Sequence, residues 1–357
     1  MTSFGEVRAS AVQAAPVVDD LAATVDKTCA LLDQAHDEGA DLVVFPETWL
    51  PGYPWWTWLG PPAWWRPFHA RYMATALTTD APELTRIRQV AARHGIALVL
   101  GFAERAGATL YISQLLTDTD GSVLAVRRKI KPTLVECTVF GEGDGRSLGV
   151  YDTGVGRLGA LACWEHLQPL TKYALFSQGE QIHAAAWPNF SMRKGGAELN
   201  TNVSQVYAME GQCFVVASTA VASPEYIARY CDTAERAAIL RPGGGYSAIF
   251  GPDGTRLTDP LDEHTEGLVT ATLDLGAIAG AKLSLDPAGH YARPDITRLI
   301  VDRRPAAPVT WVDDADDTAA GDAGARGDAG DAPARCAAPC CIDAADARHP
   351  HLGSDHI

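Results

Sequence analysis

A cysteine, a lysine and a glutamate each follow a predicted strand of this sequence, and together they could activate a thiol. Glu47 follows the apolar run D-L-V-V-F-P, Lys129 follows the run at 123–127, and Cys163 follows the run R-L-G-A-L-A. A second glutamate, Glu136, lies seven residues after the lysine. In α/β sheets, active groups gather in the crevice outside the strand ends. The sequence therefore predicts that these side chains meet.

Such a group of residues has a defined chemistry. The thiolate is the reactive form of cysteine, and a carboxylate can take the thiol proton if burial raises the pKa of that carboxylate. A nearby lysine stabilises the negative charge that develops when a thiolate attacks a carbon–nitrogen bond. A sharp turn between a strand and a helix at 168–178 would also place Cys163 beside helix N–H groups that favour the thiolate.

Each residue has an ordinary explanation when it is taken alone. A glutamate after a strand is usually a solvated loop residue, and an internal cysteine is usually part of the core. A lysine among other basic residues usually belongs to a solvated face, and Glu136 could pair with one of those bases. His166, three residues after Cys163, is a rival base for the thiol or a structural hydrogen-bonding residue.

The elements expected to position these residues alternate between strand and helix. Apolar runs predict strands at 7–14, 41–46, 96–103, 109–117, 123–127, 158–162, 182–186, 214–218, 246–250 and 267–273. Helical periodicity and capping residues predict helices at 20–38, 82–94, 168–178 and 196–211. Interleaved strands and helices with short connections predict one α/β domain, and the hairpins predict a mixed sheet.

The segment 53–68 is rich in aromatic residues and holds five of the nine tryptophans. Such rings often simply fill the core. The prolines at 51, 54, 61, 62 and 67, however, argue against a regular element. We therefore predict a rigid loop whose rings line a pocket mouth or a subunit contact, with Tyr53 and Trp56 as candidate substrate contacts.

The composition excludes several classes of protein. The chain has 357 residues, of which 47% are hydrophobic and 20% charged, as in an ordinary soluble protein. A net charge of -15 and a pI of about 5.0 argue against nucleic-acid binding. No apolar stretch reaches the ~18 residues of a membrane span. The N-terminus lacks the pattern of a signal peptide, so a cytoplasmic location is expected.

The composition changes near Val312. Residues 313–357 are mostly Ala, Asp and Gly, with ten aspartates and three arginines. Such a segment cannot bury enough apolar surface to offset its ordering entropy, so we predict a folded domain at 1–312 and a disordered acidic tail at 313–357. Its cysteines and histidines could form a weak metal site, but they lack a paired Cys-x-x-Cys spacing.

Five motifs resemble those of the nitrilase superfamily, and of its true nitrilase branch in particular. They are F-P-E-T, R-K-x-x-P-T-x-x-E, C-W-E-H-x-x-P-L, H-A-A-A-W-P at 183–188 and G-H-Y-A-R-P-D at 289–295, in the family's order. The match runs from about residue 6 to about residue 300. The resemblance implies a four-layer α-β-β-α sandwich without a metal or organic cofactor, and self-association into homodimers and longer spirals.

By resemblance, Cys163 is the nucleophile and Glu47 the general base. Lys129 stabilises the intermediate, and Glu136 positions the lysine and the substrate. The backbone N–H of Trp164 is a second candidate to hold the developing negative charge. We also expect three residues near the cysteine to contact substrate, namely Trp164, His166 and Trp187.

The implied reaction converts an organic nitrile to a carboxylic acid and ammonia through a covalent thioimidate and thioester. Cyanide dihydratases are very similar in these motifs and are the nearest alternative. An amidase of the superfamily would use the same residues, but the C-W-E-H context favours a nitrilase. A non-enzymatic assembly protein is the remaining alternative, and the intact set of glutamates, lysine and cysteine argues against it.

Overall fold

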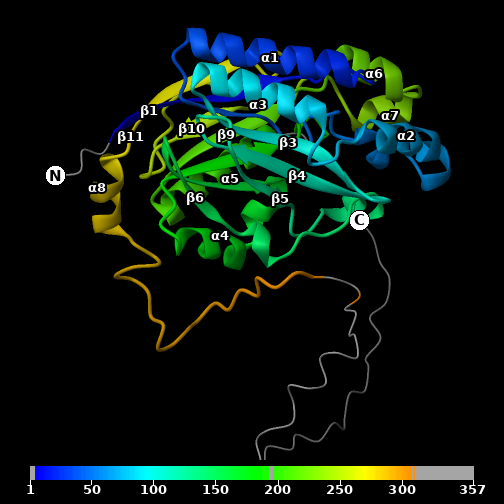
Figure 1. The fold of residues 1–357 in the computed structure, drawn as a ribbon. Helices are drawn as coiled ribbons and strands as arrows, with labels where there is room; N and C mark the ends of the chain where they lie inside the picture. Colours follow the sequence, from blue (N-terminus) through cyan, green and yellow to red (C-terminus); the bar gives the residue numbers. More distant parts are fainter. Residues whose placement is uncertain (1–4, 193–195, 307–308, 310–357) are drawn as a thin grey trace, which may run out of the picture. The chain divides into compact units, whose positions relative to one another are not determined.

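The computed structural model describes residues 5–192, 196–306 and 309, and the chain up to Ala306 forms one compact unit (Figure 1). The predicted acidic tail, 313–357, lies outside the described residues, as do the cysteines and histidines within it. None of the helices in the described ranges is both long and apolar enough to cross a membrane.

The strands form one mixed sheet with two halves. The first half runs in the order β11 (Gly267–Asp274), β1 (Glu6–Ala14), β2 (Leu42–Val44), β3 (Ala97–Ala106), β4 (Thr109–Thr117) and β5 (Val123–Arg128). The second runs β10 (Ala248–Phe250), β9 (Phe214–Ala220), β8 (Ile182–Trp187), β7 (Gly156–Ala162) and β6 (Val150–Thr153). The halves join through the parallel pairs Gln13–Thr219 and Ala14–Ala220. Each half combines parallel central strands with antiparallel outer ones.

The two halves pack against each other through alternate strand residues. Leu42 and Val44 of β2 face the second half and share a buried cluster with Leu158 and Ala184. Val43, between them, points to the opposite face and packs in a cluster with helix residues. This alternation follows from the two-residue period of a strand, and it explains why these strands are apolar throughout.

Helices cover both outer faces. On the first half lie α1 (Leu21–Asp37) and α3 (Pro82–His94), side by side in Figure 1. On the second lie α4 (Pro169–Phe176) and α5 (Gly196–Gly211), whose Leu175 and Tyr207 pack on Leu161. The predicted four-layer α-β-β-α sandwich with a mixed sheet is therefore confirmed.

The helix boundaries follow the local signals used to predict them. The Asp20 side chain caps α1 by accepting a hydrogen bond from Ala23 N at 2.9 Å. Gly95 ends α3 with a left-handed φ of 68°, which costs glycine least. Several short elements escaped prediction: η2 (Leu134–Thr138), η3 (Gly145–Ser147), η4 (Cys163–Leu167), β6, α6 (Pro224–Tyr230), α7 (Ala234–Ile239) and α8 (Ala277–Ser284).

The prediction of a rigid loop without a regular element at 53–68 is wrong. The segment forms the 3-10 helix η1 (Trp55–Trp58) and the start of α2 (Pro62–Thr75). Pro62 occupies the first turn of α2, where a missing N–H costs nothing. Pro67 lies inside α2, which nevertheless continues to Thr75. The rings of Trp65 and Tyr72 are buried in the same aromatic cluster, and tertiary packing of this kind overrides local propensity.

Candidate active site

The predicted lysine and both glutamates meet in the interior. Lys129 Nζ donates to Glu47 Oε1 at 2.7 Å and to Glu136 Oε2 at 2.8 Å. All three side chains are at most 2% exposed. One ammonium therefore serves two carboxylates away from water, so the second carboxylate is only partly neutralised.

Strand ends place these groups. Lys129 N donates to Ile112 O of β4, which continues the β5 ladder by one residue. Glu47 lies in the turn after β2, and its N–H contacts Trp187 O at the end of β8. The turn packs on Gly101, where a Cβ would stand 2.1 Å from Pro46 O. A side chain at 101 would therefore displace the backbone that carries Glu47.

Glu136 is held by its own short helix and by the aromatic segment. In a capping box at the start of η2, Glu136 Oε2 accepts from Thr133 N at 2.7 Å. The other oxygen accepts from Tyr53 OH at 2.6 Å, and Tyr53 OH accepts from Trp58 Nε1 at 3.2 Å. The structure thus places Tyr53, predicted as a substrate contact, directly behind Glu136.

Cys163 begins η4 immediately after β7, and its side chain is buried. Its φ of 49° lies in the left-handed region, which is strained for a residue with a Cβ. The thiol interacts with the backbone N–H of Trp164 and with the charges of Glu47, Lys129 and Glu136. The predicted thiol and its three charged partners thus share one buried site.

Burial sets the protonation of this site. It raises the pKa of Glu47 to about 8, an effect that Lys129 opposes and Glu136 reinforces. Burial alone would lower the pKa of Lys129, but Glu136 and Glu47 raise it well above its usual range. Burial and the charge of Glu47 raise the pKa of the Cys163 thiol. The resting site therefore holds a neutral thiol near a carboxyl group that titrates close to neutral pH, as a general base should.

The second carboxyl oxygen of Glu47, Oε2, accepts no hydrogen bond from Lys129. Among the described residues, its Oε2 accepts no hydrogen bond although it is buried. A buried acceptor without a partner is costly unless it has a role. This oxygen is the candidate acceptor for the thiol proton.

A buried ion pair that the sequence did not reveal ties the lysine strand to the cysteine turn. Glu165 Oε1 accepts from Arg127 Nη2 and from Ile130 N, both at 2.8 Å. Glu165 Oε2 accepts from Arg127 Nη1 at 2.9 Å and from Ala162 N at 2.8 Å. Because Ile130 follows Lys129 and Ala162 precedes Cys163 in the chain, one carboxylate fixes the separation of the two functional segments. Despite its burial, Arg127 and these N–H groups lower the pKa of Glu165.

The predicted substrate contacts near the cysteine have different surroundings. Trp164 is 41% exposed, whereas Trp187 is buried and stacks on His166 with ring centroids 4.8 Å apart. Both ring nitrogens of the buried His166 have partners, Cys163 O at 2.6 Å and His183 Nε2 at 2.9 Å. Both ring nitrogens of His166 are thus used in hydrogen bonds within the protein, as expected of a structural residue. The substrate contacts of Trp164, His166 and Trp187 stay predictions.

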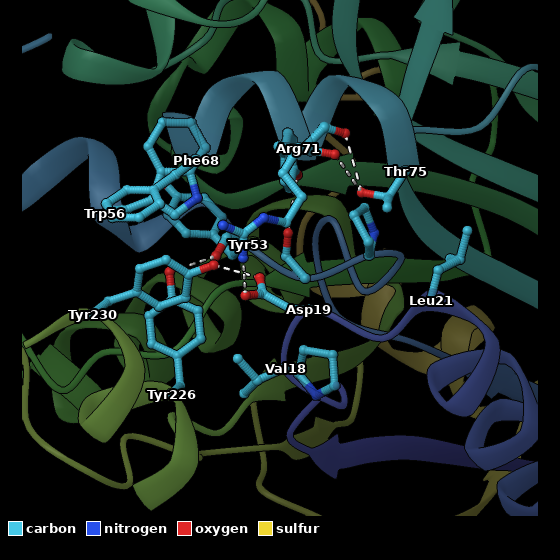
Figure 2. Close-up of a pocket in the computed structure, with 14 residues that line it drawn as sticks. Val18, Asp19, Leu21, Tyr53, Trp56, Phe68, Arg71, Thr75, Tyr226 and Tyr230 are labelled. Carbon is cyan, nitrogen blue, oxygen red and sulfur yellow. Dashed lines mark hydrogen bonds and ion pairs between the residues drawn. The ribbon is translucent and has the colours of Figure 1, made fainter. Parts of the chain in front are cut away.

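A pocket adjoins the aromatic segment, and Figure 2 shows its lining. Tyr53, Trp56 and Tyr226 form part of its wall, and Asp19 accepts hydrogen bonds from Arg71 and Tyr230. Tyr53 thus lines this pocket, while its hydroxyl donates to Glu136. Among the residues that the structure describes, no cluster of three or more His, Cys, Asp or Glu could hold a metal ion.

The family model for carbon-nitrogen hydrolases matches residues 8–283. The chain belongs to the carbon-nitrogen hydrolase family. It is 52% identical to a nitrilase of Pseudomonas syringae pv. syringae over 86% of this chain and 93% of that protein. It is 51% identical to an arylacetone-specific nitrilase of Alcaligenes faecalis over 86% of this chain and 87% of that protein.

A solved structure shows the same fold. The NitFhit protein of C. elegans superposes with a TM-score of 0.68 at 20% identity, covering 86% of this chain and 70% of that one. The predicted membership of the nitrilase superfamily is confirmed. This chain is a nitrilase-type hydrolase of carbon–nitrogen bonds.

Proposed function

We propose that this hydrolase converts an organic nitrile to the carboxylic acid and ammonia through covalent intermediates on Cys163. The observation that carries the proposal is the buried Lys129, shared by Glu47 and Glu136 beside the thiol. The relatives named as nitrilases, at 51–52% identity, support the choice of a nitrile.

In the first stage Glu47 takes the thiol proton and the Cys163 sulfur attacks the nitrile carbon. A carbon–sulfur bond forms, one π bond of the nitrile breaks, and its electron pair moves to nitrogen. The proton on Glu47 passes to that nitrogen and gives the thioimidate. Lys129 Nζ and the N–H of Trp164 hold the negative charge that develops, since donors fixed in a dry site act strongly on new charge.

In the second stage Glu47 deprotonates a water that adds to the thioimidate carbon. The proton on Glu47 passes to the nitrogen and gives a tetrahedral species that carries a hydroxyl and an amino group. Glu47 then takes the hydroxyl proton and passes it to the amino nitrogen as the carbon–nitrogen bond breaks, so ammonia leaves and a thioester remains. A second water, activated in the same way, releases the carboxylic acid and restores the thiol. The sum is one nitrile and two waters to one acid and one ammonia, and a covalent nucleophile divides this hydrolysis into easier steps.

The aromatic segment supports a preference for an aromatic or bulky nitrile. Tyr53 and Trp56 line the pocket of Figure 2, and none of the four catalytic candidates lines it. The link to the site is the Tyr53 hydroxyl, which contacts Glu136. An aromatic substituent would stack on such rings. The relative from Alcaligenes faecalis is named for an arylacetone specificity, which agrees with this assignment.

A substrate panel tests the proposal. Aryl and alkyl nitriles, the matching amides and cyanide are each incubated with the enzyme, and ammonia, acid and amide are measured. We expect acid and ammonia in equal amounts from a nitrile and no turnover in Cys163→Ala. Unchanged ammonia release by that variant would exclude the covalent mechanism, and turnover of cyanide alone would assign a cyanide dihydratase.

The same proposal includes self-association into dimers and longer spirals. Leu170 of α4 and Val206 and Met209 of α5 are exposed on the helices that cover the second half of the sheet. If these side chains form one contiguous apolar patch, that patch is the candidate contact surface. Sedimentation velocity of the full chain tests this, and a monomer at micromolar concentration would contradict it.

A further inference from the structure

A chain of buried polar side chains that the proposed mechanism does not use ends on the backbone of Cys163. Tyr207 OH lies 2.7 Å from Glu180 Oε2, and Glu180 Oε1 lies 2.6 Å from His183 Nδ1. His183 Nε2 lies 2.9 Å from His166 Nε2, and His166 Nδ1 lies 2.6 Å from the carbonyl oxygen of Cys163. The side chains of the four residues behind Cys163 are all almost completely inaccessible to water.

The protons of a neutral chain can be placed from the Cys163 end. A carbonyl oxygen only accepts, so Nδ1 of His166 carries the proton and its Nε2 accepts. His183 must then carry its proton on Nε2 and accept at Nδ1. The remaining partner of His183 is Glu180, which has to be the neutral acid and donate. Tyr207 completes the chain by donating to the other oxygen of Glu180.

The surroundings favour this neutral form. Burial lowers the pKa of both His166 and His183 well below the usual range, and burial raises the pKa of Glu180 to about 8. The charged groups that act on the chain are Arg127 and Glu165, which form an ion pair with each other, and the thiol of Cys213 faces Tyr207.

The packing holds the members of the chain in place. A Cβ at Gly159 of β7 would stand 1.9 Å from Glu180 Oε1, so this strand carries a glycine where the carboxyl group lies. The rings of Tyr207 and His183 stack with centroids 3.8 Å apart, and Trp187 stacks on His166. Neither imidazole is therefore free to turn over.

The chain ends on a peptide group with a proposed role. The carbonyl of Cys163 and the N–H of Trp164 belong to the same peptide plane, and that N–H interacts with the thiol. A donor at the carbonyl end polarises the peptide and strengthens the N–H at the other end. We infer that Tyr207, Glu180, His183 and His166 orient and polarise the Cys163–Trp164 peptide, so that its N–H stabilises the developing charge. This inference rests on the proposed function.

The inferred role requires every hydrogen bond of the series to point toward the Cys163 carbonyl, and this requires Glu180 to donate to His183. An ionised Glu180 could only accept, so His183 would carry its proton on Nδ1 and His166 on Nε2. The lone pair of His166 Nδ1 would then face the lone pairs of the Cys163 carbonyl. All four side chains are thus positioning residues, and the acid form of Glu180 sets the polarity of the chain.

Two substitutions of similar size separate this role from simple packing. In Glu180→Gln the amide can donate to His183 and accept from Tyr207, without ionising. In Glu180→Leu neither hydrogen bond is possible. We expect the leucine variant to lose about 10-fold in kcat with little change in KM, a fraction of the ~10²–10³ that removal of an oxyanion donor costs. The glutamine variant should keep kcat within about threefold. Above pH 8 the wild type should lose activity relative to the glutamine variant, because Glu180 ionises there and the glutamine side chain cannot.

A second measurement does not depend on these variants. Nitrogen-15 NMR of the resting enzyme with labelled histidine reports which ring nitrogen carries the proton. We expect the Nδ1–H form for His166 and the Nε2–H form for His183, both neutral at pH 7. The reverse tautomers would overturn the inference, even if Glu180→Leu failed to fold. Wild-type kcat in Glu180→Leu, or an equal loss in both variants, would also overturn it.

The outcomes also separate this inference from the proposed function. If Cys163→Ala still hydrolysed nitriles, the proposed function would be wrong whatever the tautomers. If that variant were inactive and the tautomers reversed, only the role of the chain would be wrong.

Discussion

The ammonium of Lys129 lies 2.7 Å from Glu47 Oε1, and neither side chain is accessible to water. Because Glu136 contacts the same ammonium, the positive charge of Lys129 is shared by two carboxyl groups and neutralises Glu47 only in part. Burial raises the pKa of Glu47 to about 8, because the shared ammonium offsets the effect of burial only in part. Glu47 can therefore take a proton from a thiol near neutral pH.

Lys129→Met tests the role of this ammonium. Without it, two buried carboxylates face each other and the developing charge loses a donor, so we expect kcat to fall about 10³-fold or more. Lys131→Met is the matched control, since Lys131 is exposed and pairs with Glu142 at the surface. Steady-state ammonia release measures both, and equal activities would argue against a catalytic lysine.

Tyr53→Phe tests whether the aromatic segment acts through Glu136. The change leaves Glu136 Oε1 without the donor at 2.6 Å, so the lysine is held less firmly. We expect at least about a 10-fold loss in kcat, in keeping with about 1.5–3 kcal/mol for a hydrogen bond to a charged group. Tyr173→Phe removes a hydroxyl that contacts Pro287 O and should leave kcat unchanged. A change in KM alone would instead make Tyr53 a substrate contact.

Glu165→Gln tests the buried ion pair of Arg127 and Glu165, which joins the segment of Lys129 to the segment of Cys163. Breaking a buried pair leaves the Arg127 charge uncompensated, so we expect a loss of about 3–5 kcal/mol in the free energy of unfolding. The pKa of Glu165 is lowered on folding. Its contribution is therefore fully present above the unfolded pKa, about 4.3, and is lost as the pH falls through the folded pKa.

Denaturant unfolding of wild type and Glu165→Gln at several pH values measures this contribution. The difference between them should shrink as the pH drops below about 4.3. A difference that stayed constant would mean that the charge of Glu165 does not matter to stability.

The pH dependence of kcat/KM tests Glu47 as the base. Because its pKa is raised to about 8, the basic form grows as the pH rises toward that value. We expect kcat/KM to increase about tenfold per pH unit well below pH 8, and to level off above it in Glu180→Gln, which lacks the loss expected of the wild type there. The Glu180→Gln background gives the cleaner profile, since it removes the other acid with a pKa near 8. A flat profile from pH 5 to 8 would exclude Glu47 as the base.

The candidate site could be predicted where its residues follow local strand signals. Lys129 directly follows β5, Cys163 directly follows β7 and Glu47 lies in the turn after β2, and the structure brings the three together. The ion pair of Arg127 and Glu165 joins residues that are 38 apart in sequence. Nothing in a local pattern marks either as buried, because charged side chains are normally exposed.

The hydrogen-bonded side chains from Tyr207 to His166 could not be predicted either, because no local pattern marks them as buried together. His166 was expected to be a rival base or a structural residue, and its contact with His183 depends on the parallel pairing of β7 with β8. The aromatic segment 53–68 misled in the opposite way. Its prolines indicated a loop, but burial of Trp65 and Tyr72 stabilises a helix that local propensity disfavours. The cytoplasmic location and the acidic tail stay predictions.

The central claim is a covalent acyl group on Cys163. It is tested by mixing the enzyme with an aryl nitrile, quenching with acid during turnover, and measuring the masses of the protein and its peptides. We predict that the peptide carrying Cys163 gains the mass of the thioimidate or the thioester, and that Cys163→Ala shows neither. Full turnover with no adduct, or with an adduct on another residue, would contradict the proposed mechanism.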